Sequence, residues 1–177
     1  EHTSSVNANY KYMCENSYHG YHVGPVHASY LDYLRDRLEG TEAASLLDGS
    51  VSNYETSGAA KGLGNGHGLL YSYLPTGRPT AQWLPGMPPE MKGPIEAKRA
   101  RVAELHGEEH AVFVCETQKN LVIFPNLVIN DGVAATVRYV EPEGHGRMRV
   151  SAWALAPPEE SAELKGMRLD NFISFLG

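Results

Sequence analysis

The feature that most constrains the fold is a series of strand-like segments in the second half of the chain. Four segments are rich in β-branched and aromatic residues, which favour strands. They are Ala111–Glu116, Leu121–Asn130, Ala134–Glu141 and Arg147–Ala156. Two short sequences between them are typical of hairpin turns, namely Asn130-Asp131-Gly132 and Glu143-Gly144-His145-Gly146. Because strands joined by short turns pair antiparallel, this half of the chain predicts an antiparallel meander.

Helices are expected before and after this meander. Residues 9–22 carry aromatic side chains at spacings of three and four, and Gly24-Pro25 is expected to end that helix because Pro lacks an amide donor. Further helices are predicted at Ser29–Leu38, at 94–107 and within Glu159–Asp170. The sum predicts an α+β fold, with an antiparallel sheet packed against helices on one side.

Between these regions, residues 41–94 are rich in Gly, Pro, Ser and Thr, which favour loops. We expect only short strands here, around Val51–Thr56 and Leu69–Tyr73. The Gly-rich stretch Gly62–Gly68 lacks the spacing of a nucleotide-binding loop, so we interpret it as a loop beside a pocket, where His67 could touch a substrate.

Composition excludes several classes of protein. The 177 residues suit one domain, and the net charge of −6 without a basic stripe argues against nucleic acid as a partner. No apolar run approaches the roughly 20 residues needed to span a bilayer, so no membrane association is expected. The two cysteines, Cys14 and Cys115, form no Cys-x-x-Cys pair and suit a reducing cytoplasm.

Three histidines, His19, His22 and His27, fall within nine residues. Imidazole is a good ligand for iron, zinc and copper. Residues five apart on a continuous helix point about 140° away from each other, so His22 and His27 can share a metal only if the helix ends between them. We expect the Gly24-Pro25 break to allow this. Spacing alone leaves open both a metal site and structural or surface histidines.

The same stretch resembles the iron-binding signature of ring-hydroxylating, Rieske-type dioxygenase α subunits. The matching motifs are Asn9-Tyr10-Lys11, Glu15-Asn16, Gly20-Tyr21-His22 and His27. Phe124-Pro125-Asn126 and the segment Arg168–Gly177 also resemble parts of that family, and the similarity runs from about Val6 to Gly177. The resemblance implies a helix-grip version of the α+β fold, with iron between the helix at 9–22 and the sheet.

The resemblance also implies roles for particular residues. His22 and His27 would be two ligands of a mononuclear Fe(II), Asn16 would lie close to the iron, and His19 would stand near it in the chain of groups that delivers electrons. Three further residues are expected to contact the substrate, namely Asn120, Val128 and Leu176. The implied activity is the hydroxylation or cis-dihydroxylation of an aromatic substrate with O2.

This sequence departs from the family pattern in three respects. His19 stands where the family usually has an Asp that links the iron site to the Rieske cluster of a neighbouring subunit. The third, carboxylate ligand is expected after Gly177. No Cys-x-His pair is present, so we expect residues 1–177 to be a single, incomplete catalytic domain without the Rieske domain, and inactive alone.

The resemblance further implies cofactors and partners that this chain would need. The Rieske [2Fe–2S] cluster would lie in the missing domain, and electrons would arrive from a reductase or a ferredoxin. Relatives are commonly trimers, so we expect a homotrimer or a hetero-oligomer with a β subunit.

Two other functions fit the same residues. His19, His22 and His27 could bind zinc in a hydrolase, with Glu15 as a nearby base. A helix-grip domain that lacks metal could instead bind an apolar ligand in its cavity. Metal analysis distinguishes the first alternative, and a ligand that copurifies without metal would indicate the second.

Overall fold

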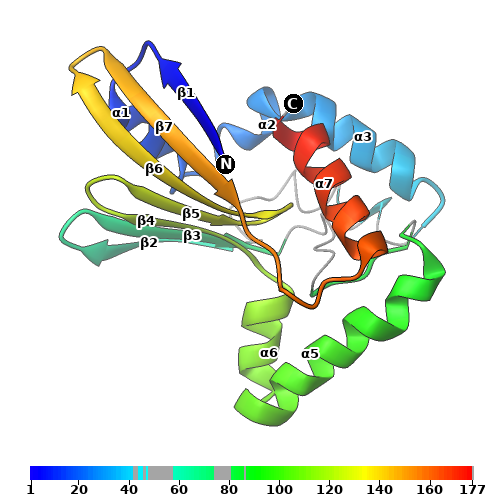
Figure 1. Cartoon of the computed structure of the whole chain (residues 1–177). Coiled ribbons are helices and arrows are strands. Elements are labelled where there is room, and N and C mark those ends of the chain that lie inside the picture. The colour runs from blue at the N-terminus through cyan, green and yellow to red at the C-terminus, as the bar shows by residue number, and fades with distance from the viewer. Residues whose placement is uncertain (42–43, 46, 48–57, 74–80, 86, 177) are drawn as a thin grey trace.

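The computed structural model describes residues 1–41, 44–45, 47, 58–73, 81–85 and 87–176. Within them, seven strands form one antiparallel sheet in the order β1-β7-β6-β5-β4-β3-β2 (Figure 1). The strands are β1 (His2–Val6), β2 (Gly58–Gly64), β3 (His67–Ser72), β4 (Gln118–Ile123), β5 (Leu127–Asp131), β6 (Ala135–Gly144) and β7 (Arg147–Ala154). Strands β2 to β7 follow chain order across the sheet, and β1 pairs with β7 at the far edge.

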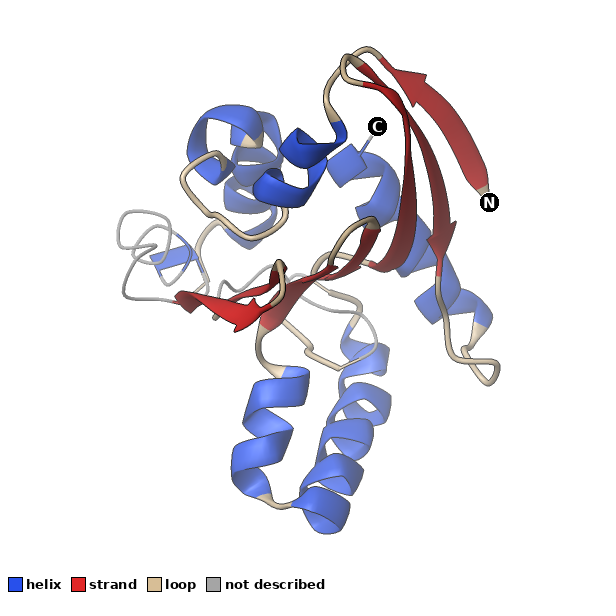
Figure 2. Cartoon of the chain, turned by 90° about the vertical axis from the view of Figure 1, so that its left-hand side faces the viewer, coloured by secondary structure: helices blue, strands red, loops and turns tan. Residues whose placement is uncertain are grey.

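The helices lie on both sides of this sheet rather than on one side as predicted (Figure 2). They are α1 (Tyr10–Asn16), α2 (Val23–Val26), α3 (Ala28–Leu38), the 3-10 helix η1 (Pro89–Met91), α5 (Lys92–His106), α6 (Glu108–Cys115) and α7 (Ala162–Leu176). Figure 2 shows α5 and α6 as a hairpin that projects away from the sheet. Helix α7 lies beside α3 (Figure 1), where Arg37 donates a hydrogen bond to Asn171.

One face of the sheet is apolar beneath α1. Side chains on alternate positions of a strand share a face, and the strand register places one apolar set together. This set is Val122, Val128, Val140, Met148 and Val150. Helix α1 packs Tyr10, Met13 and Cys14 onto it. The burial fixes α1 over one end of the face and leaves the other end of the same face to a pocket.

The α+β, helix-grip-like class is confirmed, as are both hairpin turns. The helices predicted at Ser29–Leu38, at 94–107 and within Glu159–Asp170 match α3, α5 and α7. The strand expected around Leu69–Tyr73 is β3. The strand expected around Val51–Thr56 lies outside the described residues, and no strand was predicted at β1.

The predicted helix at 9–22 is wrong in its extent and in where it ends. Helix α1 ends at Asn16, and a turn leads to α2, which contains Gly24 and Pro25. The first turn of a helix leaves its amide groups without intrahelical partners, so Pro25 there removes no helix bond. The break between His19 and His27 therefore comes before Gly24-Pro25 rather than at it.

Two strand predictions are also wrong. Of the segment Ala111–Glu116, all but the C-cap residue Glu116 belongs to helix α6, where Ala111 and Cys115 are buried one turn apart. A short apolar run does not distinguish a buried strand from a helix by its periodicity. Leu121–Asn130 is divided into β4 and β5 by a turn at Phe124-Pro125-Asn126. Pro cannot donate to a strand ladder, which is why the pairing ends there.

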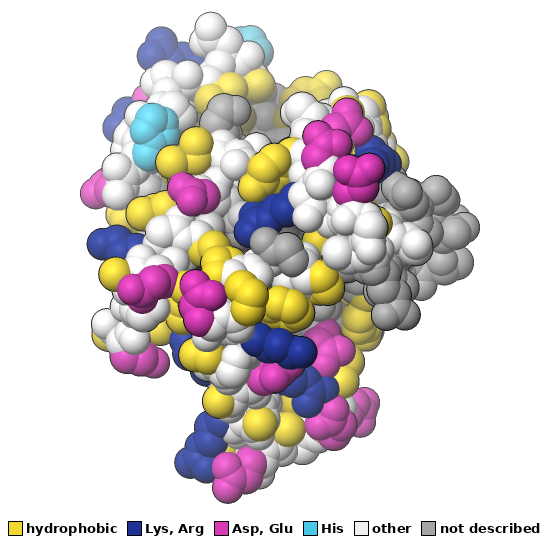
Figure 3. All heavy atoms as spheres, turned by 90° about the vertical axis from the view of Figure 1, so that its right-hand side faces the viewer, with side chains coloured by type: hydrophobic (Ala, Val, Ile, Leu, Met, Phe, Trp, Pro, Cys, Tyr) yellow, Lys and Arg dark blue, Asp and Glu magenta, His cyan; other side chains and the backbone are white. Residues whose placement is uncertain are grey.

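Charges on the surface are mixed in sign. On the face that carries α7, Figure 3 shows Lys and Arg side chains interspersed with Asp and Glu, with apolar side chains between them. A continuous basic stripe, which nucleic acid binding favours, is not seen on this face. Among the described residues, no helix combines the length and apolarity required to cross a membrane.

Candidate functional site

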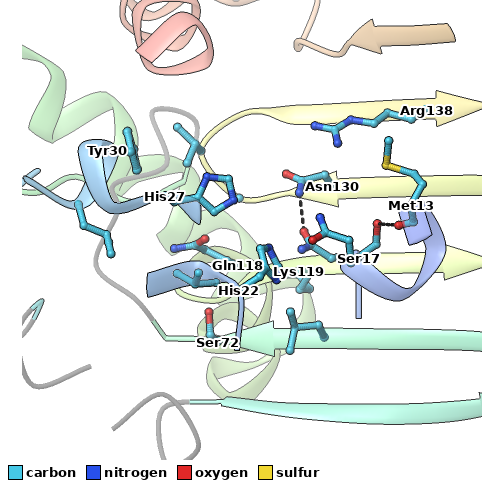
Figure 4. A pocket seen from close by; sticks show the side chains of 17 residues that line it. Met13, Ser17, His22, His27, Tyr30, Ser72, Gln118, Lys119, Asn130 and Arg138 are labelled. Atoms are coloured by element: carbon cyan, nitrogen blue, oxygen red, sulfur yellow. Dashed lines mark hydrogen bonds between the residues drawn. The ribbon is translucent and has the colours of Figure 1, made fainter. Parts of the chain in front are cut away.

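A pocket of about 240 Å³ lies between helices α1–α3 and the sheet face that α1 leaves uncovered. Its helical side carries His22 and His27 together with apolar side chains such as Leu31. Its sheet side is mainly polar, with residues from β3 to β6 (Figure 4). These are Ser72, Gln118, Lys119, Asn120, Asn130 and Arg138. The pocket therefore has a mixed helical side, where Asn16, Ser17 and Tyr30 also line it, and a mainly polar sheet side.

His22 and His27 flank the short helix α2, His22 as its N-cap and His27 as its C-cap. Their ring centroids lie 5.5 Å apart, with the ring planes at 65°. Two imidazoles on one ion can lie up to roughly 6–7 Å apart, since a metal–nitrogen bond is about 2 Å long. The separation thus suits two ligands of one metal.

His19 contacts the first of these rings. The Nδ1 atoms of His19 and His22 lie 3.1 Å apart, within hydrogen-bonding distance. The other side of the His19 ring stacks on Tyr21, with centroids 3.7 Å apart and nearly parallel planes. These contacts hold His19 beside His22.

Both pocket histidines favour the neutral form. Burial lowers the pKa of His22, and the charges of His19 and His27 lower it further. Burial also lowers the pKa of His27, as does the positive charge of Arg138. Neutral imidazole has a free lone pair on one ring nitrogen, which is the form that binds metals.

His22 and His27 fit two of the three ligands of an iron site, and the described residues offer no carboxylate as the third. Across the described ranges, no group of three or more His, Cys, Asp or Glu side chains is arranged to hold a metal. Glu15, the base considered for a zinc hydrolase, is exposed, and so is Asp170 on α7. A carboxylate that completes the site would have to come from outside these residues.

The polar wall is organised by hydrogen bonds between neighbouring strands. The Nδ2 atom of Asn130 donates to Oδ1 of Asn120 over 2.6 Å. Lys119 donates from Nζ to the carbonyl oxygens of Phe113 and Thr117, each over 2.9 Å. These contacts fix the amide side chains of the wall and hold the Lys119 ammonium against the backbone.

The residues expected from the sequence to touch iron or substrate lie in different places. Asn16 and Asn120 line the pocket beside the histidines. Val128 is buried beneath α1, against Cys14 and Val122, and is not among the described pocket-lining residues. Leu176 ends α7, and its side chain lies outside what the structure describes.

Apart from Asn120, sequence reasoning missed the basic and amide side chains on the sheet side of the pocket, Arg138 above all. Arg138 lies between Thr136 and Val140 at alternate positions of β6, and both of those neighbours are buried. An arginine in register with inward-facing residues of a strand was the signal available in the sequence.

The Gly-rich stretch Gly62–Gly68 is not a pocket loop. It forms the turn and flanking residues of the β2–β3 hairpin. His67 accepts a hydrogen bond at Nδ1 from the amide of Phe124, over 3.0 Å, and is not among the described lining residues. Gly66 has φ +82°, and a Cβ there would meet the Phe124 ring at 2.7 Å. These residues hold the β2–β3 turn against the β4–β5 turn.

Comparison with known proteins identifies the class. Residues 1–175 match the family model described as the ring hydroxylating alpha subunit (catalytic domain), and the chain belongs to this family. A large subunit of 2-halobenzoate 1,2-dioxygenase from Burkholderia cepacia is 29% identical over 94% of this chain and 33% of its own length. The anthranilate 1,2-dioxygenase large subunit of Acinetobacter baylyi is 27% identical over 94% of the chain and 34% of its own length.

Solved structures share the fold. Naphthalene 1,2-dioxygenase with indole bound in the active site superposes with a TM-score of 0.69 at 21% identity, covering 96% of this chain and 36% of that one. The enzyme from Rhodococcus sp. bound to indole gives 0.65 at 20% identity, covering 99% and 38%. The chain therefore spans about a third of the length of the relatives it matches.

Proposed function

We propose that this chain forms the catalytic part of an oxygenase that uses O2 to hydroxylate or cis-dihydroxylate an aromatic ring. His22 and His27 would hold a mononuclear Fe(II), and a carboxylate outside the described residues would be its third ligand. The observation that carries the proposal is the pair of imidazoles 5.5 Å apart in the pocket of a chain from this family.

Iron held by two histidines and one carboxylate keeps open positions, at which it would activate O2. The chain's own residues bind and orient the substrate. Met13, Leu31, Leu70 and Val133 offer apolar contacts to a ring and help to exclude water from the pocket. Asn16 and Asn120 supply amide groups at its edge, and Leu176 is proposed as a further contact.

Val128 supports the pocket indirectly in this proposal. It packs beneath α1, against Cys14, and thereby holds the helix whose C-terminal end carries Asn16. His19 is proposed to orient His22 and to stand on the route by which electrons reach the iron.

We further propose the remaining parts of the system. Electrons would come from a reductase or ferredoxin through a Rieske [2Fe–2S] cluster that residues 1–177 do not contain. The likeness to dioxygenase large subunits supports an oligomer, either a homotrimer or an assembly with a β subunit. Two buried free thiols, Cys14 and Cys115, are compatible with a reducing, cytoplasmic location.

Product analysis with the full-length protein tests this function. The protein is supplied with its electron-transfer partners, NADH, 18O-labelled dioxygen and a panel of arenes that includes benzoate and naphthalene. We expect a hydroxylated or cis-diol product that carries the label, and none from the His27→Ala variant. His110→Ala, which alters an exposed histidine on α6, is the matched control and should retain turnover. Unlabelled product, or turnover by His27→Ala, would contradict the proposal.

A further inference from the structure

Arg138 is the pocket residue that the proposed function does not use. It lies on β6, opposite Val128 of β5 and Ala152 of β7, and its side chain enters the pocket. Figure 4 shows its guanidinium extending toward Asn130 and His27. The position is therefore inside the cavity that the substrate would occupy.

This guanidinium has no anionic partner in the part of the chain that the structure describes. The described residues that line the pocket include neither Asp nor Glu. Elsewhere the arginines Arg99, Arg149 and Arg168 each form an ion pair with a glutamate. Arg138 thus differs from them in being turned into a cavity with its charge uncompensated.

Lys119, the other cation that borders the pocket, directs its ammonium to groups of the protein itself. Its ammonium donates to the backbone carbonyls of Phe113 and Thr117, and it lies 3.8 Å from a carboxylate oxygen of Asp131. The donors of Lys119 are therefore occupied within the protein. Of the two cations among the described lining residues, Arg138 is therefore the one available to a ligand.

The burial of Arg138 favours the binding of an anion in the pocket. Removal from water lowers the pKa of Arg138, although a guanidinium remains protonated at neutral pH. A buried charge without a partner is unfavourable, so an anion that enters the pocket regains the interaction that desolvation removed. The flat fork of donors on a guanidinium matches the two oxygens of a carboxylate.

The surroundings of Arg138 define the rest of the ligand. His27, one of the proposed iron ligands, is close enough for the charge of Arg138 to lower its pKa. Leu31 and Val133 add apolar surface between the helices and the sheet. A ligand that fits has an anionic group at Arg138 and an apolar body that reaches the histidines.

We propose that Arg138 binds the carboxylate of an aromatic acid and so makes the pocket selective for benzoate-type substrates over neutral arenes. The inference rests on the proposed function for the identity of the apolar body as an aromatic ring. Amide donors from the Asn120–Asn130 pair, which are linked by a 2.6 Å hydrogen bond, border the same end of the pocket.

Equilibrium binding to the full-length, iron-loaded protein tests the inference. The probes are benzoate and benzamide, which have nearly the same shape and differ in charge, and Kd is measured by calorimetry. The unsubstituted protein should bind benzoate more than about 10-fold more tightly than benzamide. In Arg138→Gln the Kd for benzoate should rise about 10- to 100-fold, as expected for loss of a charge-assisted hydrogen-bond pair, while that for benzamide stays within about 3-fold.

Two further variants separate the effect of charge from that of hydrogen-bond geometry and provide a control. Arg138→Lys keeps the positive charge but loses the paired N–H donors of the guanidinium. Its Kd for benzoate should therefore lie between those of the unsubstituted protein and Arg138→Gln. Arg149→Gln removes an exposed arginine from neighbouring β7 and should leave both Kd values unchanged. Equal loss of benzoate and benzamide in Arg138→Gln, loss of its iron, or no preference for benzoate in the unsubstituted protein would each overturn the inference.

Binding and turnover separate this inference from the proposed function. Arg138-dependent binding of benzoate without any oxygenated product would leave the carboxylate site standing and refute the oxygenase. Labelled product from naphthalene, with no binding preference for benzoate, would leave the oxygenase standing and refute the carboxylate site.

Discussion

The Nδ1 atoms of His19 and His22 lie 3.1 Å apart, so one ring donates a hydrogen bond to the other. A hydrogen bond at one ring nitrogen determines which nitrogen remains for a metal. If His22 donates from Nδ1, its Nε2 lone pair is the one that can bind iron. His19 would then act as the partner that orients this ligand.

Removal of this partner should weaken the iron site without abolishing it. We expect His19→Leu in the full-length protein to lower iron affinity about 10- to 100-fold, because orienting partners of metal-bound histidines contribute about that much. His19→Asn retains a hydrogen-bonding side chain and should lose less. Iron affinity is measured by competition with a chelator, and equal affinities for all three proteins would contradict the orienting role.

A buried ion pair at the start of α7 should contribute strongly to stability. Arg168 donates from Nε and Nη2 to the two carboxylate oxygens of Glu160, each over 2.9 Å, and both side chains are almost fully buried. Glu160→Gln leaves the arginine without its counter-charge, so we expect the free energy of unfolding to fall by about 3–5 kcal/mol. Urea unfolding of the full-length protein measures this change.

An exposed pair provides the control for that measurement. Arg101 and Glu104 form an ion pair on the solvent face of α5, 2.6 Å apart. Glu104→Gln should change the free energy of unfolding by less than about 1 kcal/mol, because solvent screens exposed pairs. Equal effects of the two substitutions would refute the distinction between them.

The packing of α3 predicts a second stability effect. Leu34 is 3% exposed and packs with Leu31, Leu38 and Val133 in one cluster. Leu34→Ala should lower the free energy of unfolding by about 2–5 kcal/mol through lost contacts and a residual cavity. Leu105→Ala, at a position 56% exposed on α5, should change it by less than about 1 kcal/mol. A smaller effect at Leu34 than at Leu105 would show that α3 is not packed as described.

Cys14 should be unreactive in the folded protein. Burial against Val122 and Val128 raises the pKa of its thiol, so the reactive thiolate is rarer at any given pH than for a free cysteine. Because the folded state favours the neutral thiol, this contribution to stability is complete below the ordinary thiol pKa and is lost as pH rises through the higher folded value. Alkylation at pH 8 should be slow at Cys14 until denaturant is added, and rapid labelling of the native protein would contradict its burial.

The sequence predicted the part of the fold that local signals determine. The turns after Asn130 and Glu143 identified the β5–β6–β7 meander, because their residue types match specific hairpin turns. Ala111–Glu116 was predicted as a strand because five apolar or β-branched residues in a row fit either structure. Its helical state follows from packing, which buries Ala111 and Cys115 on one side of α6.

The site was predicted mainly where a family motif was present, and Asn120 was added from the wider resemblance. His22, His27 and Asn16 were chosen from motif spacing, and all three border the pocket. Arg138 was missed because its role depends on the pairing of β6 with β5, which determines the face it occupies. Val128 was placed in the pocket from its position after Phe124-Pro125-Asn126, but the register of β4 and β5 sets it beneath α1 instead.

Iron content of histidine variants tests the central claim most directly. The full-length protein, His22→Ala, His27→Ala and the control His110→Ala are purified in parallel without oxygen, and metal per chain is measured by mass spectrometry. We expect about one mononuclear iron in addition to the cluster iron in the unsubstituted protein and in His110→Ala, and the loss of that one iron in the other two. Retention of that iron in His22→Ala or His27→Ala, or zinc in its place throughout, would contradict the assignment.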